Sequence, residues 1–173
     1  MKISKNEKTK SIIITCITLI TFVELYLAYK ISKEYAGVYQ IGVFILPIIL
    51  QPFVYNSLLR EAKAYLKLRI ITIGLLSLIL PLIIYYTLPE YTYNQGKQAI
   101  ELHEQTSKNS VYIDIYKNKQ TVPLVDNSER LLIYPKAYYY GIKSTVDNKY
   151  FIVSPLTGEI ILLSEDFYLG LKN

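Results

Sequence analysis

Three long apolar runs occupy the first half of the chain, and short basic stretches separate them. The runs cover residues 11–29, 37–55 and 70–87. A helix needs about 20 apolar residues to cross the hydrocarbon core of a bilayer. The pattern therefore predicts a membrane protein with three transmembrane α-helices over these ranges.

The second run is the least regular of the three. It contains no charged residue, but it holds Gln40, Pro47, Gln51 and Pro52. Because proline interrupts helical hydrogen bonding, a re-entrant loop that enters and leaves the bilayer on one side is the alternative to a full span.

Basic residues predict the orientation of the spans. Residues 1–10 contain four Lys, the 30–36 loop contains two, and the 56–69 loop contains four Lys or Arg. Short loops rich in Lys and Arg remain cytoplasmic. We therefore expect a multi-pass protein of the cell membrane with a cytoplasmic N-terminus and its C-terminal domain outside. A re-entrant second run would leave the basic 56–69 loop outside, which the rule disfavours.

The 56–69 loop is also amphipathic when it is drawn as a helix. It is expected to lie along the inner lipid headgroups, with one apolar and one basic face. The apolar face comprises Leu58, Leu59, Ala62, Tyr65 and Leu66, and the basic face comprises Arg60, Lys63 and Lys67.

The N-terminal segment has two competing interpretations. A secretory signal peptide has a shorter apolar region and a small-residue cleavage site, and the 11–29 run is too long and lacks such a site. A lipoprotein anchor at Cys16 would require small residues before it, where Ile14 and Thr15 stand. Both interpretations are rejected. Since Cys16 is the only cysteine, no intrachain disulfide can form.

Charge is distributed unevenly between the two halves. Residues 1–87 carry ten Lys or Arg and four acids, whereas residues 88–173 carry nine and ten. Basic residues beside apolar segments favour anionic membrane lipids as partners, and they give no indication of nucleic-acid binding. A composition rich in Ile, Lys, Asn and Tyr, without Trp, suggests an AT-rich bacterial genome.

Residues 88–173 predict a small α+β domain, in which one helix precedes an antiparallel β-meander. Thr92 and Gln95 have the spacing of a capping box, and the helix is expected to run to about Ser107. Its inward face would comprise Tyr93, Gly96, Ile100 and His103.

Short apolar or alternating runs predict the strands of this domain. Pro123 places its own run at a sheet edge or in a loop, and Ser164 is expected to cap a short final helix. The predicted strands cover residues 111–118, 121–125, 131–135, 137–145, 148–155 and 159–164.

The clearest turn joins the last two strands, in the sequence FIVSPLTGEI at 151–160. Pro155 restricts φ, Thr157 can hydrogen-bond locally and Gly158 supplies a positive φ, so these residues close a hairpin. The helix, the strands and this hairpin resemble the PepSY family, whose domains often end in a strand, an Asp-Pro-x-Thr-Gly-Glu turn and another strand. The resemblance covers at most residues 91–164, and Ser154 stands where the family usually has Asp.

The PepSY resemblance implies a non-enzymatic domain outside the membrane. Domains of this family are associated with inhibiting or regulating peptidases and with envelope sensing. This expectation rests on the resemblance alone.

Two polar residues in the apolar runs are candidates for a function inside the membrane. Glu24 is the one acid in these runs, and intramembrane acids are costly. Gln40 is expected at a similar depth, where it could hydrogen-bond Glu24. The alternative, which we favour, is that Glu24 is protonated or extends toward the outer surface and only ties helices together, because an ion or proton pathway would normally contain more than one acid.

Two other groups of residues carry hypotheses of partner contact. Thr15, Thr18 and Thr21 recur on one helical face, which favours packing against another helix. Tyr138, Tyr139 and Tyr140 form a possible partner-binding surface, since neighbours on a strand point to opposite sides and at least one ring is expected to be exposed unless a partner covers it. Packing against the predicted helix is the alternative, and it is the one that we favour.

Catalytic motifs are missing from the sequence. His103 is the only histidine, so no zinc site of the usual kind can form, and it is expected to be a half-buried helix residue. The chain contains no G-x-S-x-G, P-loop or G-x-G-x-x-G motif. We therefore predict no catalytic residue, no metal, no cofactor and no enzymatic activity.

The leading functional hypothesis is an extracytoplasmic PepSY-like domain that binds or regulates a protein or peptide partner in the envelope. The alternative is a membrane-embedded accessory or immunity-type subunit that acts through its helices. Glu24, Gln40, Pro47 and the threonine face support it. A third hypothesis, an unrecognised membrane enzyme, has no motif in its support.

Overall fold

A computed structural model describes residues 5–60, 65–103, 111–113, 120–124, 131–143 and 148–169. The chain divides into two compact units, each formed by two segments. The helical unit contains Met1–Lys30 and Ile41–Leu88, and the sheet unit contains Ile31–Gln40 and Pro89–Asn173.

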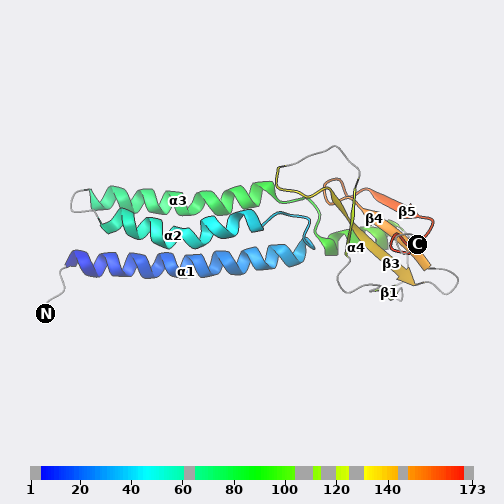
Figure 1. Ribbon diagram of the computed structural model, residues 1–173, viewed down its shortest axis with the longest axis horizontal. Coiled ribbons are helices and arrows are strands. Elements are labelled where there is room, and N and C mark those ends of the chain that lie inside the picture. The colour runs from blue at the N-terminus through cyan, green and yellow to red at the C-terminus, as the bar shows by residue number, and fades with distance from the viewer. Residues whose placement is uncertain are drawn as a thin grey trace. The chain divides into compact units, whose positions relative to one another are not determined.

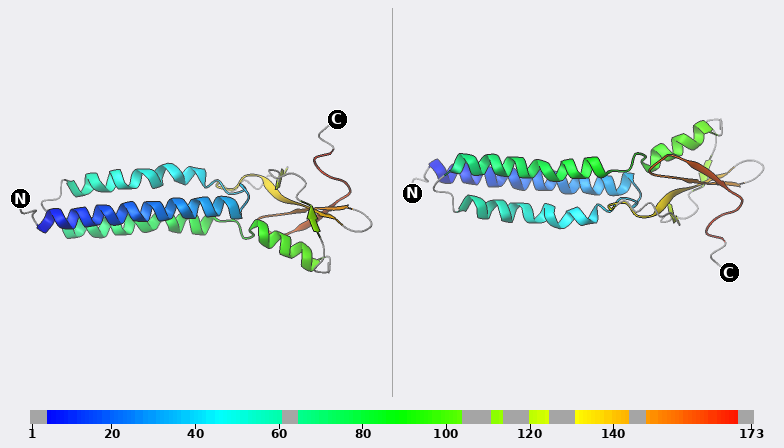
Figure 2. Two further views of the ribbon diagram at one scale, coloured as in Figure 1. Left: turned by 90° about the horizontal axis from the view of Figure 1, so that it is seen from below. Right: turned by 90° about the horizontal axis from the view of Figure 1, so that it is seen from above.

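Three long helices lie side by side and form the helical unit, apart from the end of α1 after Lys30 (Figures 1 and 2). They are α1 (Lys5–Glu34), α2 (Gly42–Arg60) and α3 (Leu66–Thr87). By length and composition each is apolar enough to cross a membrane, which confirms the three predicted apolar helices. Their orientation across a bilayer stays a prediction.

The second helix begins five residues later than its apolar run. Residues 35–37 form a turn with a positive φ at Ala36 and Gly37, and Tyr39 then forms a β-bridge with Ile133 of the sheet unit. From Gly42 onward α2 is continuous through both of its prolines. A continuous helix lacks the reversal of direction that a re-entrant loop requires.

The connection between α2 and α3 is not one amphipathic helix. α2 extends to Arg60, α3 begins at Leu66, and Tyr65 adopts a left-handed conformation with φ of 63°. The helix assumed for the amphipathic pattern is therefore interrupted at Tyr65, while the position of this segment along the lipid headgroups stays a prediction. Residues 61–64 lie outside the described part of the chain.

The buried residues of α1 and α2 repeat every three or four positions, so each set lies along one face of its helix. α3 contributes one buried residue, Ile73, to a cluster that joins all three helices. The buried set on α1 is Ile17, Thr21, Glu24 and Ala28, and the set on α2 is Phe44, Ile48, Gln51, Tyr55 and Leu59.

The sheet unit contains one helix and an antiparallel sheet. α4 spans Tyr93–His103, and the strands are β1 (Val111–Ile113), β2 (Thr121–Pro123), β3 (Lys136–Lys143), β4 (Asn148–Val153) and β5 (Ile160–Leu163). The strand order is β1-β3-β4-β5, and β2 also pairs with β3. β1 and β2 pair with opposite ends of β3 along the same edge. One helix followed by the β3-β4-β5 meander agrees with the prediction.

The start of α4 has the predicted capping box. The Thr92 backbone N–H donates to Gln95 Oε1 over 2.8 Å, and the Gln95 N–H donates to Thr92 Oγ1 over 3.3 Å. These bonds satisfy backbone donors that the first turn of a helix leaves unpaired.

Several predicted boundaries in this unit differ from the structure. The 131–135 run is not a strand, because Ile133 makes only the isolated bridge to Tyr39. The residues after Ser164 form a turn in which the Leu169 N–H donates to the Asp166 carbonyl, so no final helix forms in the described part of this segment. The predicted ends at 104–107, 114–118, 125 and 144–145 lie outside the described residues.

Both faces of the sheet are covered. α4 lies on one face and the C-terminal segment lies on the other (Figure 2). Gly96 and Ile100 are the buried residues of α4, while Tyr168 packs with Ala137 and Tyr139 on the opposite face. As a result β3 is buried at six consecutive positions, from Ala137 to Ile142.

Candidate functional site

The polar candidate of the helical unit is a hydrogen-bonded pair between α1 and α2. Gln51 Nε2 donates to Glu24 Oε2 over 2.8 Å. The two residues are only 8% and 7% exposed. The expected partner, Gln40, belongs instead to the sheet unit, where its backbone N–H donates to the Leu132 carbonyl. The predicted Glu24–Gln40 bond is therefore wrong, because the second helix begins after residue 40.

The threonine face of α1 uses its hydroxyls within the helix. Thr15, Thr18 and Thr21 each donate to the carbonyl four residues earlier. Of the three, only Thr21 is buried. Because the Thr21 hydroxyl donates its proton within α1, it cannot donate a hydrogen bond to Glu24.

The tyrosine triplet is a core element of the sheet unit. Tyr138, Tyr139 and Tyr140 are 0%, 4% and 3% exposed. The expectation that at least one ring is exposed is corrected, because α4 covers one face of β3 and the C-terminal segment covers the other. The stacking of Tyr140 on Tyr93 of α4, with centroids 4.7 Å apart, matches the packing alternative.

The hydroxyl of each buried tyrosine has an acceptor. Tyr138 donates to the Tyr91 carbonyl over 2.8 Å, and Tyr140 donates to the Tyr93 carbonyl over 2.6 Å. Tyr139 points to the other face and donates to Asp166 Oδ1 over 2.6 Å. Buried polar groups are costly unless they are hydrogen-bonded, so these bonds permit the burial of the triplet.

Burial perturbs the acid–base chemistry of this core. Loss of hydration raises the pKa of Tyr138, and nearby Tyr35 adds to the rise. Burial also raises the pKa of Tyr139, and the hydrogen bond and negative charge of Asp166 raise it further. Both phenols are therefore neutral near pH 7, and they act as hydrogen-bond donors rather than as bases.

Asp166 is a core residue that sequence reasoning missed. It is 3% exposed, and its Oδ1 accepts from both the Tyr139 hydroxyl and the Tyr168 N–H. The bond to an N–H two residues ahead is typical of Asp in a turn. In the sequence, the signal for a buried turn rather than a final helix is Asp166 followed directly by two aromatic residues, Phe167 and Tyr168.

The hairpin at 154–159 has the local bonds expected of a tight turn. Gly158 has a φ of 71°, its N–H donates to the Ser154 carbonyl, and Thr157 Oγ1 accepts from the Glu159 N–H. Ser154 Oγ accepts from the N–H groups of Leu156 and Thr157. The structural roles predicted for Thr157 and Gly158 are confirmed.

The hairpin also holds the segment before α4. The Tyr91 N–H donates to the Pro155 carbonyl over 3.0 Å. A Cβ atom at Gly158 would lie 2.5 Å from the Tyr91 ring. Glycine is therefore required both by the backbone conformation and by the ring that packs on it.

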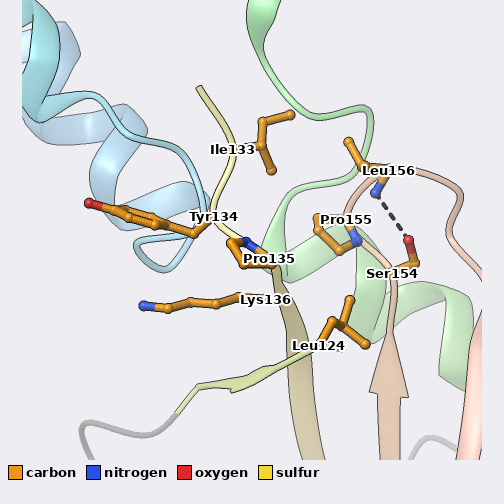
Figure 3. Close-up of a pocket in the computed structure, with 8 residues that line it drawn as sticks. All are labelled: Leu124, Ile133, Tyr134, Pro135, Lys136, Ser154, Pro155 and Leu156. Carbon is orange, nitrogen blue, oxygen red and sulfur yellow. Dashed lines mark hydrogen bonds between the residues drawn. The ribbon is translucent and has the colours of Figure 1, made fainter. Parts of the chain in front are cut away.

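A small hollow opens beside this hairpin (Figure 3). It encloses about 30 Å³, which admits a water molecule but not a metabolite. Lys136 and Tyr134 extend away from it side by side (Figure 3), with Lys136 Nζ 5.0 Å from the ring centroid. The lining residues are Leu124, Ile133, Tyr134, Pro135, Lys136, Ser154, Pro155 and Leu156.

The outer edge of the sheet is the remaining candidate for partner contact. β5 pairs with β4 and with no other described strand. Ile161 and Leu162 in the middle of β5 are 47% and 58% exposed. An edge with apolar side chains and unpaired backbone groups can accept a further strand.

His103 is exposed on the last turn of α4, which corrects the expectation of a half-buried residue. His103 follows Ile100 by three positions and so lies on the same side of α4, but Ile100 is the last buried residue of the helix. Within the described ranges, no group of three or more His, Cys, Asp or Glu residues is arranged to hold a metal.

Comparison of the chain with protein-family models, with curated proteins and with solved structures finds no match.

Proposed function

We propose that this chain is a membrane-anchored binding protein whose sheet unit binds an extended segment of a protein or peptide partner. The three helices would span the cell membrane with the N-terminus in the cytoplasm and the sheet unit outside. The observation that carries the proposal is the open, apolar edge of β5. The PepSY resemblance adds the hypothesis that the partner belongs to the envelope or is a peptidase.

Exposed apolar surface supports the membrane anchor. Within the apolar stretches of α1, α2 and α3, only 22%, 28% and 11% of the residues are buried by the rest of the chain. Soluble proteins rarely leave such contiguous apolar surface in water. Lipid tails would cover these side chains, and the basic loops favour the inward orientation of the N-terminus.

The hydrogen-bond pattern of the sheet identifies which β5 groups are open. The Ser154 N–H donates to the Glu159 carbonyl across the β4–β5 hairpin. Since bonded and non-bonded pairs alternate along antiparallel strands, Ile161 and Leu163 point their backbone groups toward β4. Ile160 and Leu162 therefore point theirs outward.

The β2–β3 pairing supports the same pattern from the other side of the sheet. The Tyr139 N–H donates to the Gln120 carbonyl on the β2 side, so Tyr138 and Tyr140 bond toward β4. With the observed register of β3 against β4, alternation again directs the backbone N–H and C=O groups of Ile152 toward β5. It leaves those of Leu162 pointing away from β4.

Charge at the ends of β5 indicates what kind of strand would bind. Glu159 and Glu165 flank the strand and are exposed, and no described residue forms an ion pair with either carboxylate. A partner strand with Lys or Arg near its ends would complement them. Antiparallel pairing of two copies would instead bring Glu159 of one copy near Glu165 of the other, so a basic, apolar peptide of another protein is the favoured occupant.

The test uses the full chain in detergent or lipid discs and a synthetic peptide of alternating Val and Thr with Lys at both ends. Leu162→Pro removes an outward N–H and should weaken peptide binding by about three- to tenfold, the equivalent of one hydrogen bond. The matched control, Leu162→Thr, retains the N–H and should bind nearly normally. Equal binding by both variants, or equal binding of a peptide with Glu at its ends, contradicts the proposal.

The orientation has an independent test. Alkaline phosphatase or green fluorescent protein is fused after Asn173 and expressed in a bacterial host. Phosphatase activity without fluorescence is the expected result. Fluorescence without phosphatase activity would place the sheet unit in the cytoplasm and restrict its partners to that compartment.

A further inference from the structure

The Glu24–Gln51 pair contains two oxygen atoms for which the described residues offer no hydrogen-bond donor. Glu24 Oε1 and Gln51 Oε1 are buried, and neither has a hydrogen-bond partner among the described residues. Both side chains are more than nine-tenths buried, and the single bond between them joins the other two polar atoms, Gln51 Nε2 and Glu24 Oε2. Unpaired buried acceptors of this kind are rare in native proteins.

An ionised carboxylate would make this arrangement unfavourable. It would place a charge between two apolar helices with one neutral hydrogen bond and no cation, since the described part of the chain contains no ion pair to Glu24. Burial of an unpaired charge is far more costly than burial of a neutral polar group. Tyr55, one turn along α2, is the titratable neighbour on the buried face, and α3 contributes Ile73.

A single proton between the two unpaired oxygens would give both of them a hydrogen bond. We infer that Glu24 is held in its protonated form, with its Oε1–H donating to Gln51 Oε1 while Gln51 Nε2 donates to Glu24 Oε2. The carboxylic acid and the amide then form a closed ring of two hydrogen bonds, because each group offers one donor and one acceptor on the same side. The pair is a proton-binding site that fastens α1 to α2, and it is independent of the function proposed for the sheet unit.

The remaining bonds of the region agree with this assignment. Thr21 lies on the same buried face of α1, but its hydroxyl donates to the Ile17 carbonyl and so its proton is not available to Glu24. Among the described residues the Gln51 side chain hydrogen-bonds only with Glu24, and no other group donates to Gln51 Oε1. The acid proton of Glu24 therefore supplies the hydrogen bond that Gln51 Oε1 otherwise lacks.

Substitutions distinguish a protonated acid from a charged one. Glu24→Gln places an amide N–H where the acid O–H would be, so it should preserve the ring and leave the thermal midpoint of the helical unit unchanged. Glu24→Leu and Gln51→Leu each leave one buried polar group without its partner and should lower the midpoint by several degrees. The double Leu variant should recover most of that loss, because neither polar group remains.

The decisive measurement is infrared spectroscopy of the full-length chain in lipid vesicles at pH 7. The carbonyl band of one protonated carboxylic acid per chain is expected; it should disappear in Glu24→Gln and shift in Gln51→Leu, which removes the hydrogen bond. The assignment is overturned if the wild-type chain shows no such band. It is also overturned if Glu24→Gln lowers the midpoint as much as Glu24→Leu, or if Na⁺ or K⁺ raises the midpoint of the wild type but not of Glu24→Gln, since the site would then hold a cation.

Discussion

The helical unit buries one acid and one amide between two apolar helices, whereas the sheet unit buries three consecutive tyrosines on both faces of one strand. In the sheet unit each hydroxyl has an acceptor, either a backbone carbonyl or Asp166. In the helical unit the Glu24–Gln51 pair leaves two oxygens without a partner among the described residues. The sheet unit therefore completes the hydrogen bonding of its own core, whereas the helical unit, under our two proposals, depends on a proton inside and on lipid outside.

The largest expected effect tests how tightly the sheet unit is packed. Gly158→Ala should lower the stability of this unit by about 2–5 kcal/mol, because a left-handed non-glycine residue costs about 1–2 kcal/mol and the displaced Tyr91 ring adds about 1–3 kcal/mol. Urea denaturation of the full chain in detergent, followed by the near-UV circular dichroism of tyrosine, measures this loss.

Gly37→Ala is the matched control for that substitution. Gly37 has a φ of 73°, close to that of Gly158, but no atom lies within 4 Å of the added Cβ. Its cost should therefore be limited to about 1–2 kcal/mol of conformational strain. Equal losses at the two positions would show that the contact between Gly158 and the Tyr91 ring adds nothing.

The second prediction separates the charged acceptor of the tyrosine core from its neutral ones. Tyr139→Phe should cost about 1.5–3 kcal/mol, since Asp166 loses a donor to its buried carboxylate. Tyr138→Phe, which loses only a bond to a backbone carbonyl, should cost about 0.5–1.5 kcal/mol. Denaturation midpoints of both variants check the order, and a reversed order would contradict the role given to Asp166.

The same core predicts the response of the sheet unit to alkaline pH. The pKa of Tyr139 is raised in the folded state, so the folded chain holds its phenolic proton more tightly than the unfolded chain. Stability is therefore complete below the unfolded pKa of about 10 and falls as the pH rises above it. Tyr139→Phe should make the fall shallower, and denaturation midpoints between neutral and strongly alkaline pH measure the slope.

The smallest expected effect compares a helical glycine in each unit. Gly96→Ala would place a Cβ 2.4 Å from Tyr140 Oη, an atom held by the Tyr93 carbonyl, so a packing cost of about 1–3 kcal/mol should exceed the gain of about 1 kcal/mol in helix propensity. Gly74→Ala on α3 meets no atom within 4 Å and should be neutral or stabilising by up to about 1 kcal/mol. Thermal unfolding of the two variants should show opposite signs, and a loss at Gly74 would reveal a close neighbour of α3.

Elements whose causes are local can be predicted from the amino-acid sequence. The three apolar helices follow from run length, the start of α4 follows from Thr92 and Gln95, and the last hairpin follows from Thr157 and Gly158. In each case the signal and the structure lie within a few residues of one another, so no knowledge of distant contacts was needed.

Contacts between residues far apart in the chain could not be predicted in this way, because they depend on the tertiary fold. The partner of Glu24 is Gln51 rather than Gln40, because residues 38–40 pair with 132–134 and the second helix starts later than its apolar run. The tyrosine triplet is buried on both faces because α4 and the segment around Asp166, more than 20 residues away on either side, cover opposite sides of β3. The hydrophobic pattern indicates which residues prefer to be buried. Which other residues cover them depends on the path of the whole chain.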